Sequence, residues 1–142
     1  MYTQTDVAWA AGFFDGEGCV TITWRRQTQR GPLKQVSPLL IASVVNVDPG
    51  AIERLHSLFG GAVRSYQHHA NGHTIYEWRA TGSKGSNFLS AVLPYSITKR
   101  TQIEVGLRFA AERPGRGKAR TAEQHTKDVT YYHALKQLKV VS

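Results

Sequence analysis

The sequence predicts an α+β fold in which a four-stranded antiparallel sheet and its helices follow the order αββαββα, with additional C-terminal helices. Apolar and polar residues alternate over 19–27, which predicts a half-buried strand. Apolar residues at helical spacing predict a helix from Gly50 to Phe59. Two similar helix–hairpin halves can share one core, so residues 1–142 are expected to form a single domain with a helical C-terminal part over about 113–142.

The other elements follow from start, turn and stop signals. Asp6 can cap the first helix, and Asp48-Pro49 is a strong helix start. Asn71-Gly72 is typical of a hairpin turn. The expected helices therefore cover 6–16, 50–59, 83–93, 99–112 and 121–138, and the expected strands cover 19–27, 37–47, 62–69 and 73–81.

The composition favours a basic, intracellular protein. The 142 residues include 18 Lys and Arg against 10 Asp and Glu, which gives a net charge of +8. Nucleic acid is therefore the first candidate partner and an anionic membrane surface the second. Cys19 is the single cysteine, which excludes an intrachain disulfide. The longest apolar stretch near the N-terminus, Val7 to Phe14, is about half a membrane span, so we expect a soluble protein that does not enter a membrane.

Asp15-Gly16-Glu17-Gly18 places two carboxylates close together at a helix end. Hard divalent cations such as Mg²⁺ prefer oxygen ligands, and the carbonyl of Gly16 could add to the carboxylates. By itself this pattern is more typical of a turn than of a metal site. The segment therefore needs its sequence context before it indicates chemistry.

Small residues occupy one face of the same helix, since Ala8, Ala11, Gly12 and Asp15 follow the spacing i, i+3, i+4, i+7. Such a face lets a second helix approach closely. A plain amphipathic core helix is the alternative interpretation.

The segment Ala10 to Gly18, Ala-Ala-Gly-Phe-Phe-Asp-Gly-Glu-Gly, resembles the LAGLIDADG motif over its whole length. Its third Gly, sixth Asp, eighth acidic residue and ninth Gly match the motif. The chain is thus similar to the LAGLIDADG homing endonucleases, which implies a metal-dependent endodeoxyribonuclease that cleaves both strands of a long, near-palindromic DNA site. The resemblance covers roughly residues 6–112, with further matches at Asn46-Val47-Asp48-Pro49, Leu58-Phe59-Gly60-Gly61, Tyr76-Glu77-Trp78-Arg79 and from Phe88 to Gln102.

The resemblance also implies roles for individual residues. Glu17 stands at the catalytic acidic position, where it would bind the metal at the scissile phosphate, with the Gly16 carbonyl beside it. Lys99 corresponds to a basic residue near the cleavage pocket, and binding of the DNA backbone is its alternative role. Asn46 corresponds to a polar residue that orders water near the metals, and Asp15 to an acid with a structural, helix-ending role. The implied cofactor is Mg²⁺, and Mn²⁺ or Ca²⁺ could occupy the same site.

The motif occurs once in the chain, so a second active site has to come from another subunit. A symmetric homodimer bound to double-stranded DNA is therefore expected. Two motif helices side by side would bring both acids near two phosphates across the minor groove. The expected dimer contacts are Ala8, Ala11, Gly12 and Asp15.

The polar faces of the strands are expected to read DNA, because a two-stranded ribbon fits the major groove. Tyr76 shares a side with Trp78, which could equally belong to the core. The loop over 113–120 is expected to bind phosphates. The nominated residues are Thr21, Thr23, Arg25, Gln27, Gln29, Ser37 and Ser43 from the first hairpin, Arg64, Tyr66, His68 and Tyr76 from the second, and Arg116, Lys118 and Arg120 from the loop.

Two other functions stay open at this point. An intron RNA maturase would bind RNA without needing Glu17. A non-catalytic DNA-binding protein of the same fold is the second alternative, and the presence of an acid at Glu17 argues against it. The sequence contains no Walker-type loop, catalytic triad or zinc-finger pattern.

Overall fold

The computed structural model describes residues 2–26, 36–68, 70, 72–112 and 121–141. It confirms the α+β fold and the four-stranded antiparallel sheet. The loop predicted over 113–120 lies outside the described residues. The elements are α1 (Gln4–Glu17), β1 (Gly18–Arg26), β2 (Val36–Asn46), α2 (Pro49–Phe59), β3 (Ala62–Gln67), β4 (Thr74–Thr81), α3 (Gly82–Val92), the 3₁₀ turn η1 (Leu93–Tyr95), α4 (Arg100–Ala111) and α5 (Ala122–Val141).

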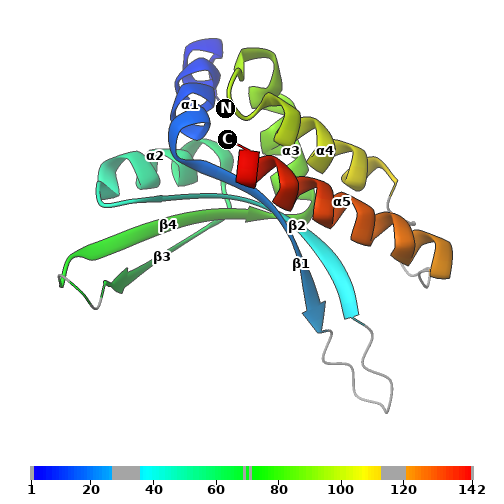
Figure 1. Cartoon of the computed structure of the whole chain (residues 1–142). Helices are drawn as coiled ribbons and strands as arrows, with labels where there is room; N and C mark the ends of the chain where they lie inside the picture. The colour runs from blue at the N-terminus through cyan, green and yellow to red at the C-terminus, as the bar shows by residue number, and fades with distance from the viewer. Residues whose placement is uncertain (1, 27–35, 69, 71, 113–120, 142) are drawn as a thin grey trace.

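The strands lie in the order β1-β2-β4-β3, and every neighbouring pair is antiparallel. Each predicted hairpin, β1–β2 and β3–β4, forms one half of the sheet, and β2 and β4 join the halves. Figure 1 shows the helices gathered on one side of the sheet, which curves around a hollow on its other side. We call this second side the open face. Alternation along the paired strands assigns to it Cys19, Thr21, Thr23, Ser37, Leu39, Ile41, Ser43, Val45, Ala62, Arg64, Tyr66, Ile75, Glu77, Arg79 and Thr81.

The core lies between the helices and the opposite face of the sheet. Val20 pairs with Ala42, Ile22 pairs with Leu40, and all four side chains are buried. Phe88 on α3 joins this layer to the helices. Its ring lies 5.3 Å from that of Phe14, 4.9 Å from that of Phe59 and 4.7 Å from that of Trp78, each edge to face.

Helix α1 begins earlier than the sequence predicts. Its N-cap is Thr3, and Asp6 is the third helical residue of a capping box. The Thr3 hydroxyl accepts from the Asp6 N–H, and the Asp6 carboxylate accepts from the Thr3 N–H. These hydrogen bonds and the nearby Arg54 guanidinium hold the pKa of Asp6 below its usual value. Thr3 is the N-cap because the Asp6 carboxylate, at the third helical position, then also accepts from the Thr3 N–H.

The start and end of helix α2 agree with the sequence prediction. Asp48 caps it by accepting from the Gly50 N–H, with Pro49 at the first turn. The helix ends at Gly60, whose φ is 73°, and Gly61 follows with a φ of 88°. Both conformations favour glycine. The Trp78 indole N–H donates to the Gly60 carbonyl over 2.8 Å, which ties this turn to β4.

The two C-terminal helices extend the helical layer over β1. Trp24 on β1 lies 5.6 Å from the His125 ring and 6.3 Å from the Tyr132 ring, both on α5. Between α4 and α5, the hydrogen bond to the Glu112 carboxylate raises the pKa of Tyr131, and partial burial adds to the shift. No helix in the described ranges is both long enough and apolar enough to cross a membrane.

Replacing Phe88 by Ala is predicted to lower the free energy of unfolding by about 3–5 kcal/mol, because three aromatic contacts are lost and a buried cavity is left. Urea unfolding followed by circular dichroism measures the loss. Phe88→Leu, which fills part of the space, should cost less. If Phe88→Ala lowered the free energy of unfolding by no more than about 0.5 kcal/mol, as a surface substitution does, a central packing role for Phe88 would be contradicted.

Candidate functional site

The C-terminal end of α1 presents an exposed carboxylate. Glu17 is the last residue of the helix, β1 begins at Gly18, and both Glu17 and Gly16 are exposed. A Cβ added to Gly16 would meet nothing within 4 Å, whereas one added to Gly18 would collide with the Phe14 ring. Glycine at position 18 therefore allows the helix to pass directly into the strand above the core. A helix C-terminus carries partial negative charge, which favours a cation.

Asp15 fixes this helix end to the start of α4. Its carboxylate accepts from the backbone N–H of Ile97 over 2.8 Å and from that of Lys99 over 3.1 Å. These contacts agree with a structural role for Asp15. They also show that its side chain is engaged within the subunit, which differs from its predicted place in a dimer contact.

Lys99 lies beside the same helix end. Its Nζ donates to the Asp15 backbone carbonyl over 3.1 Å, two residues before Glu17. The structure thus brings Lys99 from 84 residues away to the end of α1. An ammonium group has three N–H donors, so one hydrogen bond leaves donors for water or phosphate.

Asn46 takes part in a local turn. Its side-chain Oδ1 accepts from the Asp48 N–H over 2.8 Å, immediately before α2. The residue is half-buried and pairs with Tyr76. Asn46 therefore makes a structural hydrogen bond at the start of α2, and its role in ordering water near a metal stays a prediction.

The chemistry of these donors suits a hard divalent ion. Among the described residues there is no group of three or more His, Cys, Asp and Glu side chains that could enclose a metal. The end of α1 offers the Glu17 carboxylate and the Gly16 carbonyl, both oxygen donors. Mg²⁺ commonly binds through one or two carboxylates and completes its coordination with water and substrate phosphates. The residues present fit that mode better than a zinc site, which needs a closed set of protein ligands.

Most of the predicted DNA-reading residues in the described ranges share the open face. Thr21, Thr23 and Ser43 lie on its first half, and Arg64 and Tyr66 lie on its second half. Ser37 is opposite Arg25 in the register. His68 is exposed just beyond β3. Gln27, Gln29, Arg116, Lys118 and Arg120 lie outside the described residues, and of Arg25 only the backbone is described.

Tyr76 does not belong with this set. It pairs with Ser65 and Asn46, lies on the helix side with Trp78, and packs against the core. The prediction that Tyr76 reads DNA from the same surface as Arg64 is therefore wrong about its side. The residues of β4 that do lie on the open face are Glu77 and Arg79.

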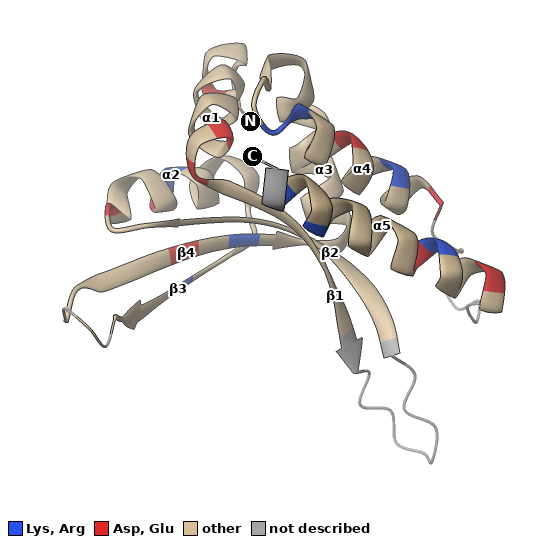
Figure 2. Cartoon of the chain, in the orientation of Figure 1, with Lys and Arg blue, Asp and Glu red and all other residues tan. Residues whose placement is uncertain are grey.

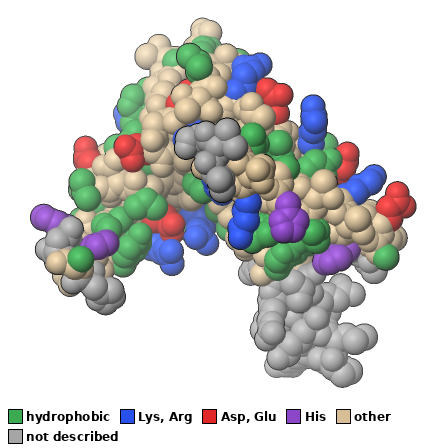
Figure 3. All heavy atoms as spheres, in the orientation of Figure 1, with side chains coloured by type: hydrophobic (Ala, Val, Ile, Leu, Met, Phe, Trp, Pro, Cys, Tyr) green, Lys and Arg blue, Asp and Glu red, His purple; other side chains and the backbone are tan. Residues whose placement is uncertain are grey.

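The open face carries a charged cluster near its centre. Figure 2 shows Lys or Arg positions on β3 and β4 beside an acidic position on β4. Figure 3 shows Lys and Arg side chains in the hollow under the sheet. The cluster consists of Arg64, Glu77 and Arg79. On the other half of the sheet, the Nζ of Lys139 from α5 donates to the Thr21 hydroxyl over 3.3 Å.

The comparisons with known proteins agree with this architecture. No protein-family model matches the chain, and no curated protein matches it. Solved structures do match. The homing endonuclease I-CvuI, in complex with its DNA target and Ca²⁺, has a TM-score of 0.73 and 21% identity, covering 95% of this chain and 82% of that chain. The archaeal intron-encoded homing endonuclease I-Vdi141I, complexed with DNA, has a TM-score of 0.69 and 17% identity, covering 94% of this chain and 84% of that chain.

The chain has the fold of the LAGLIDADG homing endonucleases. A longer protein is similar as well. The LAGLIDADG meganuclease I-AabMI, bound to uncleaved DNA, has a TM-score of 0.68 and 18% identity, and the match covers 91% of this chain but 46% of that chain. The LAGLIDADG fold of this chain thus corresponds in length to less than half of that meganuclease.

Within this LAGLIDADG fold, Ala11 is a second residue, after Asp15, that differs from the predicted contact face of α1. Ala8 and Gly12 are exposed, as a contact face requires, but Ala11 is fully buried in the core. The exposed small residues therefore run Ala8, Gly12, Gly16, and the stacked rings of Trp9 and Phe13 lie beside them. Ala11 is excluded as a dimer contact because it already packs against its own subunit.

Three residues on or near the open face escaped the sequence prediction. If Trp78 is assigned to the core, the alternation of β4 predicts that its neighbours Glu77 and Arg79 lie on the opposite, open face. Lys139 has no such signal, because only the packing of α5 over β1 brings it to Thr21.

Asp15→Ala is predicted to lower the free energy of unfolding by about 1–3 kcal/mol, since two backbone donors at the start of α4 lose their acceptor. Asp15→Asn keeps one carbonyl oxygen and should lose less. Chemical denaturation of the two variants beside the wild type tests this. Equal stability of Asp15→Ala and the wild type would refute the linkage between α1 and α4.

Proposed function

We propose that this protein is a site-specific DNA endonuclease that depends on Mg²⁺ and hydrolyses both strands of a long, near-palindromic site. The observation that carries the proposal is the end of α1, where Glu17 is exposed at the junction with β1 and Lys99 is held beside it. The similarity of the fold to homing endonucleases solved with DNA supports it.

DNA binding follows from the shape and the charge of the sheet. Each hairpin is a two-stranded antiparallel ribbon, and such a ribbon fits the major groove. The net charge of +8 favours the phosphate backbone. Thr21, Thr23, Ser43, Arg64 and Tyr66 offer donors and acceptors on the surface that would face the bases.

The chemistry would take place where the open face meets α1. A divalent ion, when bound, would neutralise charge on the scissile phosphate and help the attacking and leaving oxygens. The Glu17 carboxylate and the Gly16 carbonyl would hold it. The Lys99 ammonium, fixed through the Asp15 carbonyl, would stabilise the negative charge that develops on the phosphate.

The active enzyme would be a homodimer. The chain has one motif, and its match covers less than half of the I-AabMI meganuclease, so two copies would supply the two acids that double-strand cleavage needs. Ala8, Gly12 and Gly16 would form the contact. A Cβ added to Gly12 or Gly16 meets nothing within 4 Å in the single chain, which leaves room for a close helix pair.

Glu17→Gln is predicted to slow DNA cleavage by about 10²-fold or more while binding persists, because the amide removes the anionic ligand but keeps the shape. The substrate is selected from a randomised, near-palindromic DNA library, and cleavage is followed with Mg²⁺ and, in parallel, with EDTA. Glu104→Gln makes the same change on α4 and should cleave normally. Normal cleavage by Glu17→Gln would refute the mechanism, and binding without cleavage by the wild type would favour a maturase or a non-catalytic binder.

Gly12→Leu is predicted to convert a dimer of twice 15.8 kDa into a monomer of 15.8 kDa, because the added side chain would separate the two helices. Light scattering measures the mass. Leucine has a higher helix propensity than glycine, so unfolding of α1 is not expected. Gln137→Leu places the same leucine side chain at an exposed site on α5 and should leave the mass of the dimer unchanged. A dimeric Gly12→Leu variant would exclude this interface.

A further inference from the structure

An acidic side chain lies buried in the middle of the open face. Glu77 on β4 is 7% exposed. The two arginines beside it remain far more accessible, with 65% of the Arg64 side chain and 41% of the Arg79 side chain exposed. A carboxylate at this place opposes the binding of phosphate groups, so its presence on a DNA-facing surface needs a physical reason.

The contacts of Glu77 are specific. Arg64 and Glu77 are direct partners across β3 and β4, and the Arg64 Nε donates to the Glu77 Oε1 over 2.5 Å. The Arg79 Nη2 lies 3.7 Å from the same oxygen. The Arg64 guanidinium also lies 5.7 Å from the centre of the Tyr66 ring, two residues along the same strand. The Arg64 guanidinium is thus held by the Glu77 carboxylate and by the ring of Tyr66.

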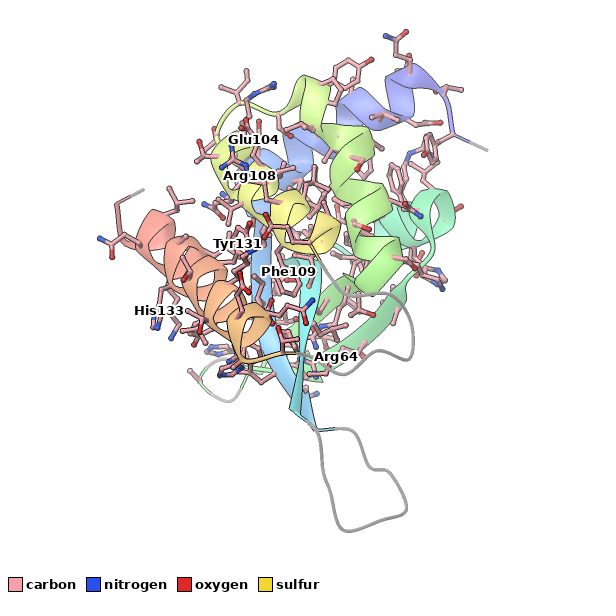
Figure 4. All side chains as sticks on the ribbon, turned by 90° about the vertical axis from the view of Figure 1, so that its right-hand side faces the viewer. Arg64, Glu104, Arg108, Phe109, Tyr131 and His133 are labelled. Carbon is pink, nitrogen blue, oxygen red and sulfur yellow. The ribbon has the colours of Figure 1, made fainter. Side chains whose placement is uncertain are left out.

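This arrangement leaves the outer edge of Arg64 available. A guanidinium has five N–H donors, and only the one on Nε is used by Glu77. Because 65% of the Arg64 side chain is exposed, its two amino groups remain accessible to a ligand. In Figure 4 the labelled Arg64 lies at the sheet, well apart from Glu104 and Arg108 on α4. A pair of amino donors in one plane is the group that reads the O6 and N7 atoms of guanine in the major groove.

The burial and the contacts of Glu77 indicate that it positions Arg64 and does not only neutralise its charge. An ion pair that only balanced charge could lie at the exposed rim, where long side chains stay mobile. A buried carboxylate pays for its desolvation only through well-formed contacts, so it fixes the geometry of the groups it touches. The Glu77 carboxylate accepts a hydrogen bond from the Arg64 Nε, whereas Arg79 approaches it only to 3.7 Å and its own Nε has no hydrogen-bond partner in the described part of the chain, so Glu77 positions Arg64 more closely than Arg79.

We propose that Arg64 reads one guanine in each half of the DNA site and that Glu77 is the positioning residue that orients it. This inference rests on the proposed binding of DNA, but it does not depend on cleavage. The Glu77 carboxylate orders the guanidinium before DNA arrives, so that less conformational freedom is lost on binding. The specificity of the second hairpin then depends on a residue that does not itself need to touch a base.

The test is selection of bound sequences from a library with randomised half-sites, by gel shift in Ca²⁺ followed by sequencing. The wild type should enrich guanine at one position in each half-site. Arg64→Gln should lose that preference by about 5- to 150-fold, the range expected for one bidentate contact. Glu77→Ala should lose most of it, and Glu77→Gln, which can still accept from the Arg64 Nε, should restore part of it.

A second readout separates positioning from a merely structural role. Both Glu77 variants remove a negative charge from the open face, so their affinity for random DNA should rise. The preference for guanine should fall at the same time. A general loss of structure would instead weaken binding at every position. Arg108→Gln and Glu104→Gln change the same charges on α4, on the other side of the sheet, and should leave the preference unchanged.

Each outcome bears on the inference. An unchanged guanine preference in Arg64→Gln or in both Glu77 variants would overturn it, as would an equal loss at all positions. If Glu77→Ala does not fold, Glu77→Gln and Arg64→Gln still decide. Selective binding by a wild type that never cleaves would refute the endonuclease proposal and leave this inference intact. Failure of the wild type to select any sequence would overturn both.

Discussion

The structure depends on the direct passage of α1 into β1. Gly18 lies against the Phe14 ring, where any side chain would collide with it, so the helix can end over the core without a loop. Asp15 then accepts two backbone hydrogen bonds from the start of α4. This junction fixes the exposed Glu17 at the edge of the sheet, because the residues on both sides of it are held by packing or by hydrogen bonds.

Because side chains alternate strictly along each strand, the residues that form the core and the residues of the open face lie on opposite sides of the sheet. On one side, Val20, Ala42 and Trp78 pack under the helices. On the other, Thr21, Ser43 and Arg64 are among the residues that no helix of the described part of the chain covers (Figure 1). A one-residue shift in any strand would exchange the two sets. The buried side therefore determines which residues can face a ligand.

The sequence predicted the elements and the shared face of most nominated strand residues, since alternation, helix caps and the motif are local signals. It failed where tertiary packing decides. Ala11 fits a small-residue face, yet it packs into its own core. The side of Tyr76 was predicted wrongly. Tyr76 and Trp78 share one face of β4, and long-range contacts of Trp78 with Gly60 and Phe88 fix that face toward the core. The contacts of Lys99 with the end of α1 and of Lys139 with Thr21 depend on helix packing that no local pattern contains.

Glu17 and Glu77 carry the same carboxylate in two different environments, one exposed and one buried. Glu17 stands exposed at a helix C-terminus, where the helix dipole and the lone carboxylate attract a cation. Glu77 is buried between two arginines, so its charge is already compensated and is directed at protein groups. A free metal ion would gain little at Glu77, because it would have to displace both guanidinium groups. The sheet can thus hold an acid on its open face without offering a metal ion an unpaired carboxylate there.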